Sequence, residues 1–258
     1  MVCALAFGAD PDILYLLDNN RVRRVFNLAP GPAPAAVPGG VVNAFSYAGG
    51  PIAPGELVSI FGSNFASALQ VAAPENNRYP TVLATTRVLF SGYEGAITAI
   101  SPSQINVFVP DWFSPATTVS LVVQVDTAAS APMDLAVRAT APGFSTTVLN
   151  QDGSINSTTN PAAPGSIVTV FGGGAGVMNP GLIWGNLSIS TPFSAPVADV
   201  AVSIGGQPAQ VLYAGSAPFQ AVGVLQVNAR VPASVTSAAQ VQITVGGVAA
   251  VPVAVAIH

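Results

Sequence analysis

The sequence carries very little charge, and none of that charge comes from lysine. Only 7% of the 258 residues are Asp, Glu, Lys or Arg, and all seven basic residues are Arg, whereas about a quarter of a typical soluble protein is charged. Residues 143–258 contain only Asp152, Asp199 and Arg230 as charged side chains. Little charge repulsion therefore keeps copies of this region apart. Two explanations stay open: a neutral, glycan-like surface on a secreted protein, or a surface buried against other copies.

Clustered positive charge is also missing. The net charge is −4, and the only basic cluster is Arg21, Arg23 and Arg24. Proteins that bind nucleic acid need Lys or Arg gathered into a patch that neutralises phosphates. We therefore expect no nucleic-acid partner.

The residues that most often carry catalysis or hold metals are nearly absent. Cys3 is the single cysteine, so no internal disulfide can form, and His258 is the single histidine. No Ser-His-Asp, Cys-His or His-rich metal set can be assembled from them. Asp10 and Asp12 fall short of a calcium loop, and the glycines of residues 171–176 have no P-loop lysine. We predict no catalytic residue, metal or cofactor, and hence no enzyme.

Long apolar helices and a leader peptide are not visible either. The longest apolar stretch, residues 241–257, contains Gln242, Pro252 and a Gly-Gly pair and alternates with period two. This pattern predicts two strands around a turn rather than a transmembrane segment. No segment keeps a period of 3.6 residues, so we expect almost no helix. The first residues lack the features of a secretory signal, so no export signal is visible.

An internal repeat is the strongest positive feature of the sequence. The motif PGELVSIFG at residues 54–62 returns as PGSIVTVFG at 164–172, and QIN-x2-VP at 104–110 returns as QVN-x2-VP at 226–232. A repeated unit of about 110 residues is the size of a β-sandwich domain. Short strands bounded by Gly, Pro, Ser and Asp fill both copies. The sequence predicts an all-β protein of two tandem immunoglobulin-like Greek-key β-sandwiches.

The region before the repeats differs in composition. Six charged residues fall within residues 10–28, and two apolar runs flank an Asp-Asn-Asn-Arg turn, which predicts a β-hairpin. Four prolines in residues 29–40 favour an extended linker. The predicted organisation is therefore a hairpin arm at 1–28, a Pro/Gly-rich linker at 29–40, a first sandwich at 41–142 and a second at 143–258.

The repeat region resembles a family of C-terminal domains found in secreted acidobacterial proteins. The resemblance covers about residues 42–258 and lies in the motifs above, together with NQDGSIN at 150–156 and IGGQPA at 204–209. Residues 14–25 resemble part of an NHL propeller repeat, although a blade needs four strands and only two are predicted here. The resemblance implies secretion and an extracellular or cell-surface location, and it implies no reaction.

The repeated motifs predict structural roles first. In each PG motif, the Pro and Gly are expected to form a turn before a strand; these are Pro54, Gly55, Pro164 and Gly165. We expect Phe61 and Phe171, at the ends of those strands, to fill the sandwich cores.

Two interpretations stay open for the repeated amides, which are Gln104, Asn106, Gln226 and Asn228. Each pair lies on one face of its strand. The amides either clamp the backbone of nearby loops or bind sugar. Sugar binding requires an exposed aromatic side chain beside them, and Trp112, Tyr93 and Trp184 are the candidates.

The leading functional hypothesis from the sequence is a secreted structural protein that binds copies of itself and builds a filament. Unpaired strands of the arm would complete the sheet of a neighbour; the candidate residues are Leu14, Leu16, Val22 and Val25. The first alternative is a surface adhesin or stalk module that binds glycan, and the second is a C-terminal sorting domain. Sequons at Asn156 and Asn186 leave glycosylation open.

Overall fold

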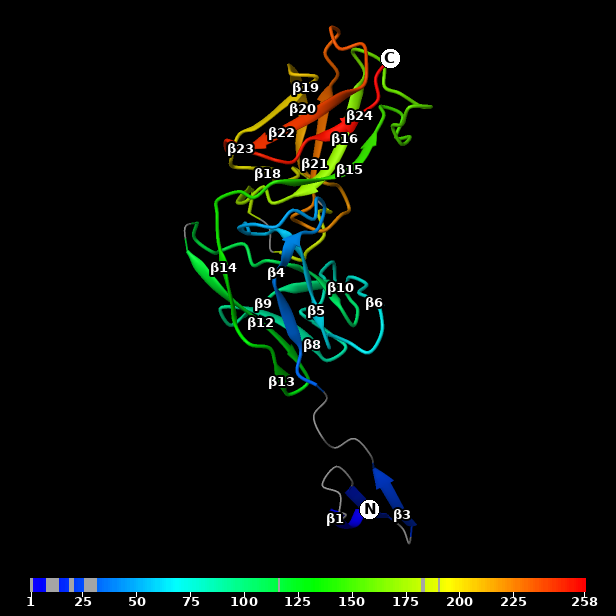
Figure 1. Ribbon diagram of the computed structural model, residues 1–258, viewed down its shortest axis with the longest axis vertical. Helices are drawn as coiled ribbons and strands as arrows, with labels where there is room; N and C mark the ends of the chain where they lie inside the picture. Colours follow the sequence, from blue (N-terminus) through cyan, green and yellow to red (C-terminus); the bar gives the residue numbers. More distant parts are fainter. Residues whose placement is uncertain are drawn as a thin grey trace.

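The computed structural model describes residues 2–7, 14–18, 21–25, 32–115, 117–181, 184–189 and 191–258. These residues form strands, turns and irregular segments, and no helix occurs among them. Figure 1 shows a small N-terminal sheet and two β-sandwiches that follow one another along the longest axis. The prediction of an all-β protein with two tandem sandwiches is confirmed.

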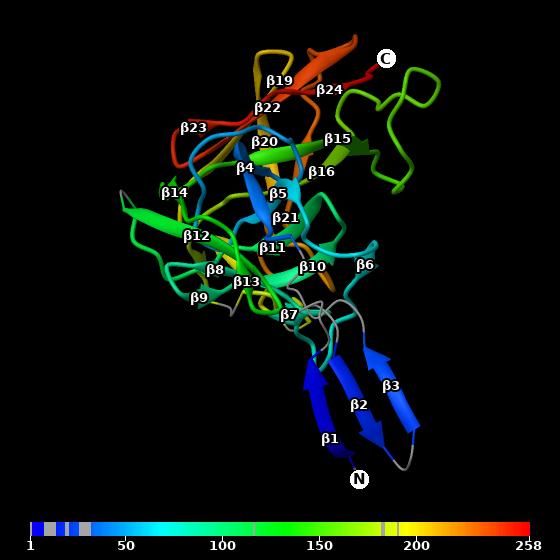
Figure 2. The same ribbon diagram turned by 60° about the horizontal axis from the view of Figure 1, so that its bottom comes forward.

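The N-terminal arm is a three-stranded antiparallel sheet. It contains β1 (Val2–Phe7), β2 (Leu14–Asp18) and β3 (Arg21–Val25), in the order β1-β2-β3. The predicted hairpin is the β2–β3 pair, in which Leu14 lies opposite Val25 and Asp18 opposite Arg21. The sequence did not predict β1, which pairs with the other side of β2. Figure 2 shows the three strands side by side, apart from the sandwiches.

The first sandwich consists of two antiparallel sheets. One has the order β4-β5-β11-β10-β6; its strands are β4 (Ala35–Asn43), β5 (Leu57–Ser63), β6 (Gln70–Val71), β10 (Ala96–Ile100) and β11 (Gln104–Phe108). The other has the order β13-β12-β8-β7, with β14 also on β12 and β9 also on β8; its strands are β7 (Val82–Leu83), β8 (Thr86–Phe90), β9 (Tyr93–Glu94), β12 (Thr118–Val125), β13 (Ala128–Ala129) and β14 (Met133–Ala136).

Strand β4 begins inside the segment that the sequence assigned to the linker. Ala35 and Ala36 pair with the end of β5, and the pairing resumes at Val41 after a register shift. The Pro-Gly-Gly sequence of residues 38–40 lies within this irregularity, where Gly39 has a φ of +74°. Proline is tolerated at an edge strand or a bulge because no ladder hydrogen bond is lost there. Pro38 therefore lies in a distorted edge strand over 35–40, a part of the chain that was predicted to be linker.

The core of the first sandwich follows the two-residue period of its strands. Alternate residues of β5 and β11 point inward and meet alternate residues of β8 and β12; the buried set includes Val58, Ile60, Ile105, Val107, Val88, Phe90, Leu121 and Val123. Phe65, from the loop after β5, is fully buried among them.

The second sandwich is one eight-stranded sheet that folds over its own core. Its path is β15-β16-β21-β20-β19-β22-β23, with β24 also on β22. The long strand β20 pairs with both β21 and β19 and so joins the two halves. The strands are β15 (Gly143–Leu149), β16 (Ile167–Gly173), β19 (Val200–Ile204), β20 (Gln207–Ser216), β21 (Leu225–Arg230), β22 (Ala239–Val245), β23 (Val248–Ala249) and β24 (Val253–Val255). Val168, Val227 and Ile243 are in its core.

Phe61 and Phe171 do not fill the cores, contrary to the prediction. Strand β5 points Val58 and Ile60 inward, so the two-residue period places Phe61 on the outer face, where it is only partly buried. Phe171 is placed in the same way on β16. The core rings are instead Phe65 and Phe90 in the first sandwich and Phe144 in the second.

The glycine after each of these outer phenylalanines makes room for a core ring. A Cβ atom on Gly62 would collide with the ring of Phe65, and a Cβ atom on Gly172 would collide with the ring of Phe144. The repeated Phe-Gly pair therefore combines an outward ring with a position that admits no side chain.

The two sandwiches contact each other through backbone and side chains. Between β17 (Met178–Asn179) and β18 (Ala195–Pro196), the second sandwich sends a loop to the first. There Tyr79 N donates to Gly185 O at 2.8 Å, and Leu187 N donates to Asn77 O at 2.8 Å. A third buried cluster, which includes Phe108 of β11 and Ala221, fills the junction.

Candidate functional site

The repeated amides bond to one another and to a hydroxyl of the neighbouring strand. Gln104 Nε2 donates to Asn106 Oδ1 at 2.8 Å, and Ser59 Oγ donates to the same oxygen at 2.9 Å. In the second sandwich, Gln226 Nε2 donates to Asn228 Oδ1 at 3.0 Å, as does Thr169 Oγ1 at 3.0 Å. The prediction that these amides clamp loop backbone is wrong for the described residues, because they lie on a sheet face and not at its ends.

The outer phenylalanines lie directly beside these amides. Phe61 is opposite Gln104 across the β5–β11 pair, and Phe171 is opposite Gln226 across the β16–β21 pair. Each sandwich therefore presents a ring, two amides and a hydroxyl on one outer sheet face. From sequence, the expected aromatic neighbours of the amides were Trp112, Tyr93 and Trp184, because Phe61 and Phe171 were expected inside the cores.

The Pro-Gly pairs form tight turns before β5 and β16. Gly55 has a φ of +71° and Gly165 a φ of +82°, and these left-handed conformations favour glycine. The turns close through Glu56 N to Ala53 O at 3.2 Å and Ser166 N to Ala163 O at 3.1 Å.

Glu56, after the first of these turns, is a buried acid. It is 2% exposed, and its carboxyl group accepts hydrogen bonds from Asn43 Nδ2 at 2.8 Å and from Ala53 N at 2.7 Å. Removal from water raises its pKa to about 8, and the two hydrogen bonds only partly oppose that rise. Ser166 is its counterpart in the second repeat and donates to Ala163 O at 2.6 Å. The first sandwich therefore has a titrating group that the second lacks.

Four aromatic side chains meet where the loop that carries Trp184 reaches the first sandwich. We call this set, which consists of Tyr93, Trp112, Phe113 and Trp184, the aromatic cluster. Tyr93 and Trp112 pack edge to face with ring centroids 5.2 Å apart, and Trp112 meets Trp184 at 4.1 Å in the same manner. Phe113 lies 6.2 Å from Tyr93. Tyr93 remains 53% exposed and Trp112 46% exposed, so both rings present surface to a ligand.

The cluster joins the two sandwiches, because Trp184 comes from the loop between β17 and β18. Trp184 also lies under the guanidinium of Arg78, whose central carbon is 5.5 Å from the ring centroid, a cation–π distance. Its Nε1 is buried and has no hydrogen-bond partner among the described residues. Beside Trp112, burial raises the pKa of the Asp111 carboxyl. The sequence analysis named both tryptophans and Tyr93 but missed Phe113 and Arg78.

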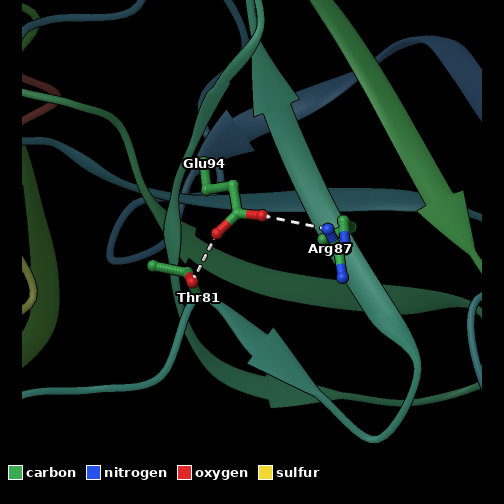
Figure 3. A network of polar contacts seen from close by, with 3 residues as sticks. All are labelled: Thr81, Arg87 and Glu94. Carbon is green, nitrogen blue, oxygen red and sulfur yellow. Dashed lines mark hydrogen bonds and ion pairs between the residues drawn. The ribbon is translucent and has the colours of Figure 1, made fainter.

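A polar network holds the strand that carries Tyr93. Glu94, the other residue of β9, accepts a hydrogen bond from Thr81 Oγ1 at 2.6 Å and pairs with Arg87 Nη1 at 3.3 Å (Figure 3). Tyr93 itself lies opposite Phe90 of β8, whose ring is buried in the core. The strand that carries Tyr93 is thus held by its pairing with β8 and by the contacts of Glu94.

Three further observations concern metal ligands, membrane-spanning helices and the glycosylation sequon at Asn156. Within the described ranges, no group of three or more His, Cys, Asp or Glu side chains is placed to hold a metal ion. In the same part of the chain, no helix has the length and apolar character to cross a membrane. The Asn156 side chain is already engaged, since its Nδ2 donates to Asn150 Oδ1 at 2.9 Å and to Ala256 O at 2.9 Å.

The residues proposed for strand exchange lie in an arm whose central strand is already paired. Leu14 and Leu16 belong to β2, which has β1 on one side and β3 on the other. Val22 and Val25 belong to β3, where they lie opposite Leu17 and Leu14. The expectation of an arm hairpin without partners is therefore wrong for β2, which pairs with β1, a strand that was not predicted from sequence.

Comparison with known protein families finds a match within the first sandwich. Residues 41–137 match the sequence profile of the IPT/TIG domain. This sandwich is therefore similar to IPT/TIG domains. The IPT/TIG fold is an immunoglobulin-like β-sandwich, in agreement with the two sheets. The match includes Tyr93 and Trp112 and leaves the second sandwich outside it.

The solved structures that are similar to this chain include SGBP-B from a complex xyloglucan utilization locus in Bacteroides uniformis, with 19% sequence identity and a TM-score of 0.28. The alignment covers 86% of this chain and 49% of that one, so the chain spans about half of its length. Comparison with curated proteins gave no match. The resemblance to acidobacterial C-terminal domains and NHL repeats gains no support from these comparisons.

Proposed function

We propose that this chain is a non-enzymatic glycan-binding module that acts outside the cell or at its surface. The observation that carries the proposal is the aromatic cluster, in which Tyr93 and Trp112 are about half exposed and held against each other at 5.2 Å. The CH groups on the face of a sugar ring pack against aromatic faces, and both surfaces lose water on contact. Fixed exposed rings are therefore suited to sugar chains.

The charge of the chain supports a neutral ligand. Charged residues make up 7% of the sequence, and Arg78, Arg87 and Glu94 near the cluster already have aromatic or ionic partners. A nucleic acid would require a basic patch. The filament hypothesis is not carried forward, because its main physical reason, an unpaired hairpin, does not hold for β2.

Tryptophan fluorescence tests the proposal directly. The chain has two tryptophans, and both belong to the cluster, so a ligand bound there changes the emission. Covering the exposed half of a Tyr93 ring is worth about 1–1.5 kcal/mol. Tyr93→Ala should therefore weaken binding of neutral oligosaccharides about tenfold.

Tyr47→Ala is the matched control. Tyr47 is 60% exposed and packs on Phe61 with centroids 6.4 Å apart, so it is a comparable tyrosine outside the cluster. Binding by this variant should equal that of the unmodified protein. An emission spectrum unchanged by every glycan, or equal binding by the Tyr93 variant, would refute the proposal.

A further inference from the structure

A cavity of about 650 Å³ lies between the two sandwiches, away from the exposed rings of the aromatic cluster. Four rings line it: Tyr79 and Phe108 from the first sandwich, Phe171 from the second, and Phe45 from the loop after β4. Ligand pockets commonly have volumes of about 300–1,000 Å³ and form at domain junctions. We call this space the junction cavity.

The polar groups of the junction cavity are uncharged. Thr98, Gln220 and Gln226 line it together with the rings and small apolar residues, and none of its described lining residues carries a formal charge. A charged ligand would lose its hydration there without a counter-charge, at a high cost in free energy. The lining therefore selects a neutral ligand that has both apolar faces and hydrogen-bonding groups.

Gln226 retains capacity to bind such a ligand. Its Nε2 donates to Asn228 Oδ1 at 3.0 Å, and this Asn228 oxygen also accepts from Thr169 Oγ1. An amide offers an oxygen acceptor and two N–H donors. Among the described residues, the Oε1 atom of Gln226 has no hydrogen-bond donor. Phe171 lies directly opposite Gln226 across the strand pair, so an apolar ring and a free acceptor face the cavity together.

The rim of the cavity carries a strained, exposed aromatic residue. Phe219, between the lining residues Pro218 and Gln220, is 71% exposed and has a φ of +61°. Phe219 N donates to Ser188 O at 2.8 Å, and Ser188 N donates to Gln220 O at 2.8 Å. A bulky residue in this conformation is unfavourable and persists where the surroundings enforce it. The loop thus holds a ring in solvent beside the opening.

We propose that the junction cavity is a second carbohydrate site, which takes a neutral sugar unit against the partly buried ring of Phe171 with a hydroxyl on Gln226. The choice of sugar rests on the proposed function, whereas the cavity, its neutrality and its free acceptor stand on their own observations. Because the lining comes from both sandwiches, the site exists only in the intact pair. Phe219 covers the outer part of the bound chain.

The first repeat supplies a matched control. Gln104 makes the same hydrogen bond to its neighbouring Asn and lies opposite Phe61 in the same register, yet Gln104 is not among the cavity-lining residues. Gln226→Ala and Gln104→Ala remove equivalent amide networks. The two variants should lose similar amounts of stability, but only Gln226→Ala alters the proposed site.

The test is calorimetric titration of the full chain with neutral hexose and pentose oligosaccharides, and with oligogalacturonate as a charged comparison. We expect Gln226→Ala and Phe219→Ala to weaken the neutral ligand at least tenfold and Gln104→Ala to change it less than twofold. Phe219 is exposed, so its variant should fold normally. Equal losses in both Gln variants, or equal binding of oligogalacturonate, would overturn the proposal.

Tyr93→Ala separates this site from the aromatic cluster. The junction cavity contains no tryptophan in its described lining, so its occupation is read from heat and not from emission. If binding heat survives Tyr93→Ala but is lost in Gln226→Ala, the junction site stands even where the proposed function of the cluster fails. If all heat disappears with Tyr93→Ala, the junction proposal fails and the cluster remains.

Discussion

Glu56 should make the first sandwich less stable as the pH rises from about 4.5 to about 8. In the unfolded chain this acid has a pKa of 4.5, and in the folded protein burial raises its pKa to about 8. Between these values the folded state holds a proton that the unfolded state has lost. The stabilising contribution of this proton is therefore fully present at or below pH 4.5, falls as the pH rises, and is gone above about pH 8. Asp111, whose pKa is also raised by burial, acts in the same direction.

The magnitude follows from the width of that window. Each pH unit contributes about 1.4 kcal/mol, so from pH 5 to pH 8 the free energy of unfolding should fall by about 4 kcal/mol. Glu56→Gln removes the titration, but its amide nitrogen must face either Asn43 Nδ2 or Ala53 N, which both donate. Asn43 cannot turn over, because its Oδ1 accepts from Phe45 N and Ser46 N. The variant should lose about 1–2 kcal/mol at pH 5.

Urea unfolding at several pH values, followed by tryptophan emission, checks both numbers. The unmodified protein should be the more stable form at pH 5 and the less stable one at pH 8. At pH 5 the unmodified protein should be more stable than Glu56→Gln by about 1–2 kcal/mol, and it should lose about 1.4 kcal/mol with each pH unit. The two stability curves should therefore cross at about pH 6. A curve for the unmodified protein that rises or stays flat with pH would refute the reasoning. An equal slope in Glu56→Gln would assign the effect to other groups.

Three further perturbations test the fold. Gly172→Ala should destabilise the second sandwich by about 1–3 kcal/mol in urea unfolding, because the new Cβ collides with the Phe144 ring. Gly49→Ala is the control and should be neutral, because its new Cβ meets only one Val42 methyl at 3.9 Å. Asn156→Ala removes hydrogen bonds to Ala256 N and O and should cost about 1–3 kcal/mol in the same assay. Deletion of residues 1–28 should leave calorimetric glycan binding unchanged; fibres in negative-stain micrographs that vanish on deletion would instead revive the filament hypothesis.

The repeat made the fold predictable, because two landmarks in the same order indicate two copies of one domain. The two-residue period showed which residues of β5 and β16 share a face, but not which face is buried. The prediction was wrong for Phe61 and Phe171 because hydrophobic character was weighed above register: Ser59 lies on the same face as Phe61, and Val58 and Ile60 on the other. Strict use of the period would have placed both rings outside.

The candidate sites were harder to predict from sequence than the fold. Trp112 and Trp184 are 72 positions apart, and their contact depends on how the second sandwich sends a loop back to the first. No local pattern encodes such a contact, since it arises from packing between domains. The junction cavity combines Phe108 with Phe171 for the same reason. Only the residue types, aromatic rings beside amides, could be listed beforehand as suited to sugar.

The two proposed sites share a support, which fixes their separation. Trp184 of the aromatic cluster and Phe108 of the junction cavity belong to one apolar cluster that fills the space between the sandwiches. A flexible linker would let two sites adapt to many glycans, with an effective concentration set by its length. A packed junction instead holds them at one spacing. Only a glycan chain long enough to span that spacing can then bind both sites at once and gain affinity from doing so. The packing at the junction would therefore select the length of the glycan chains that bind most tightly.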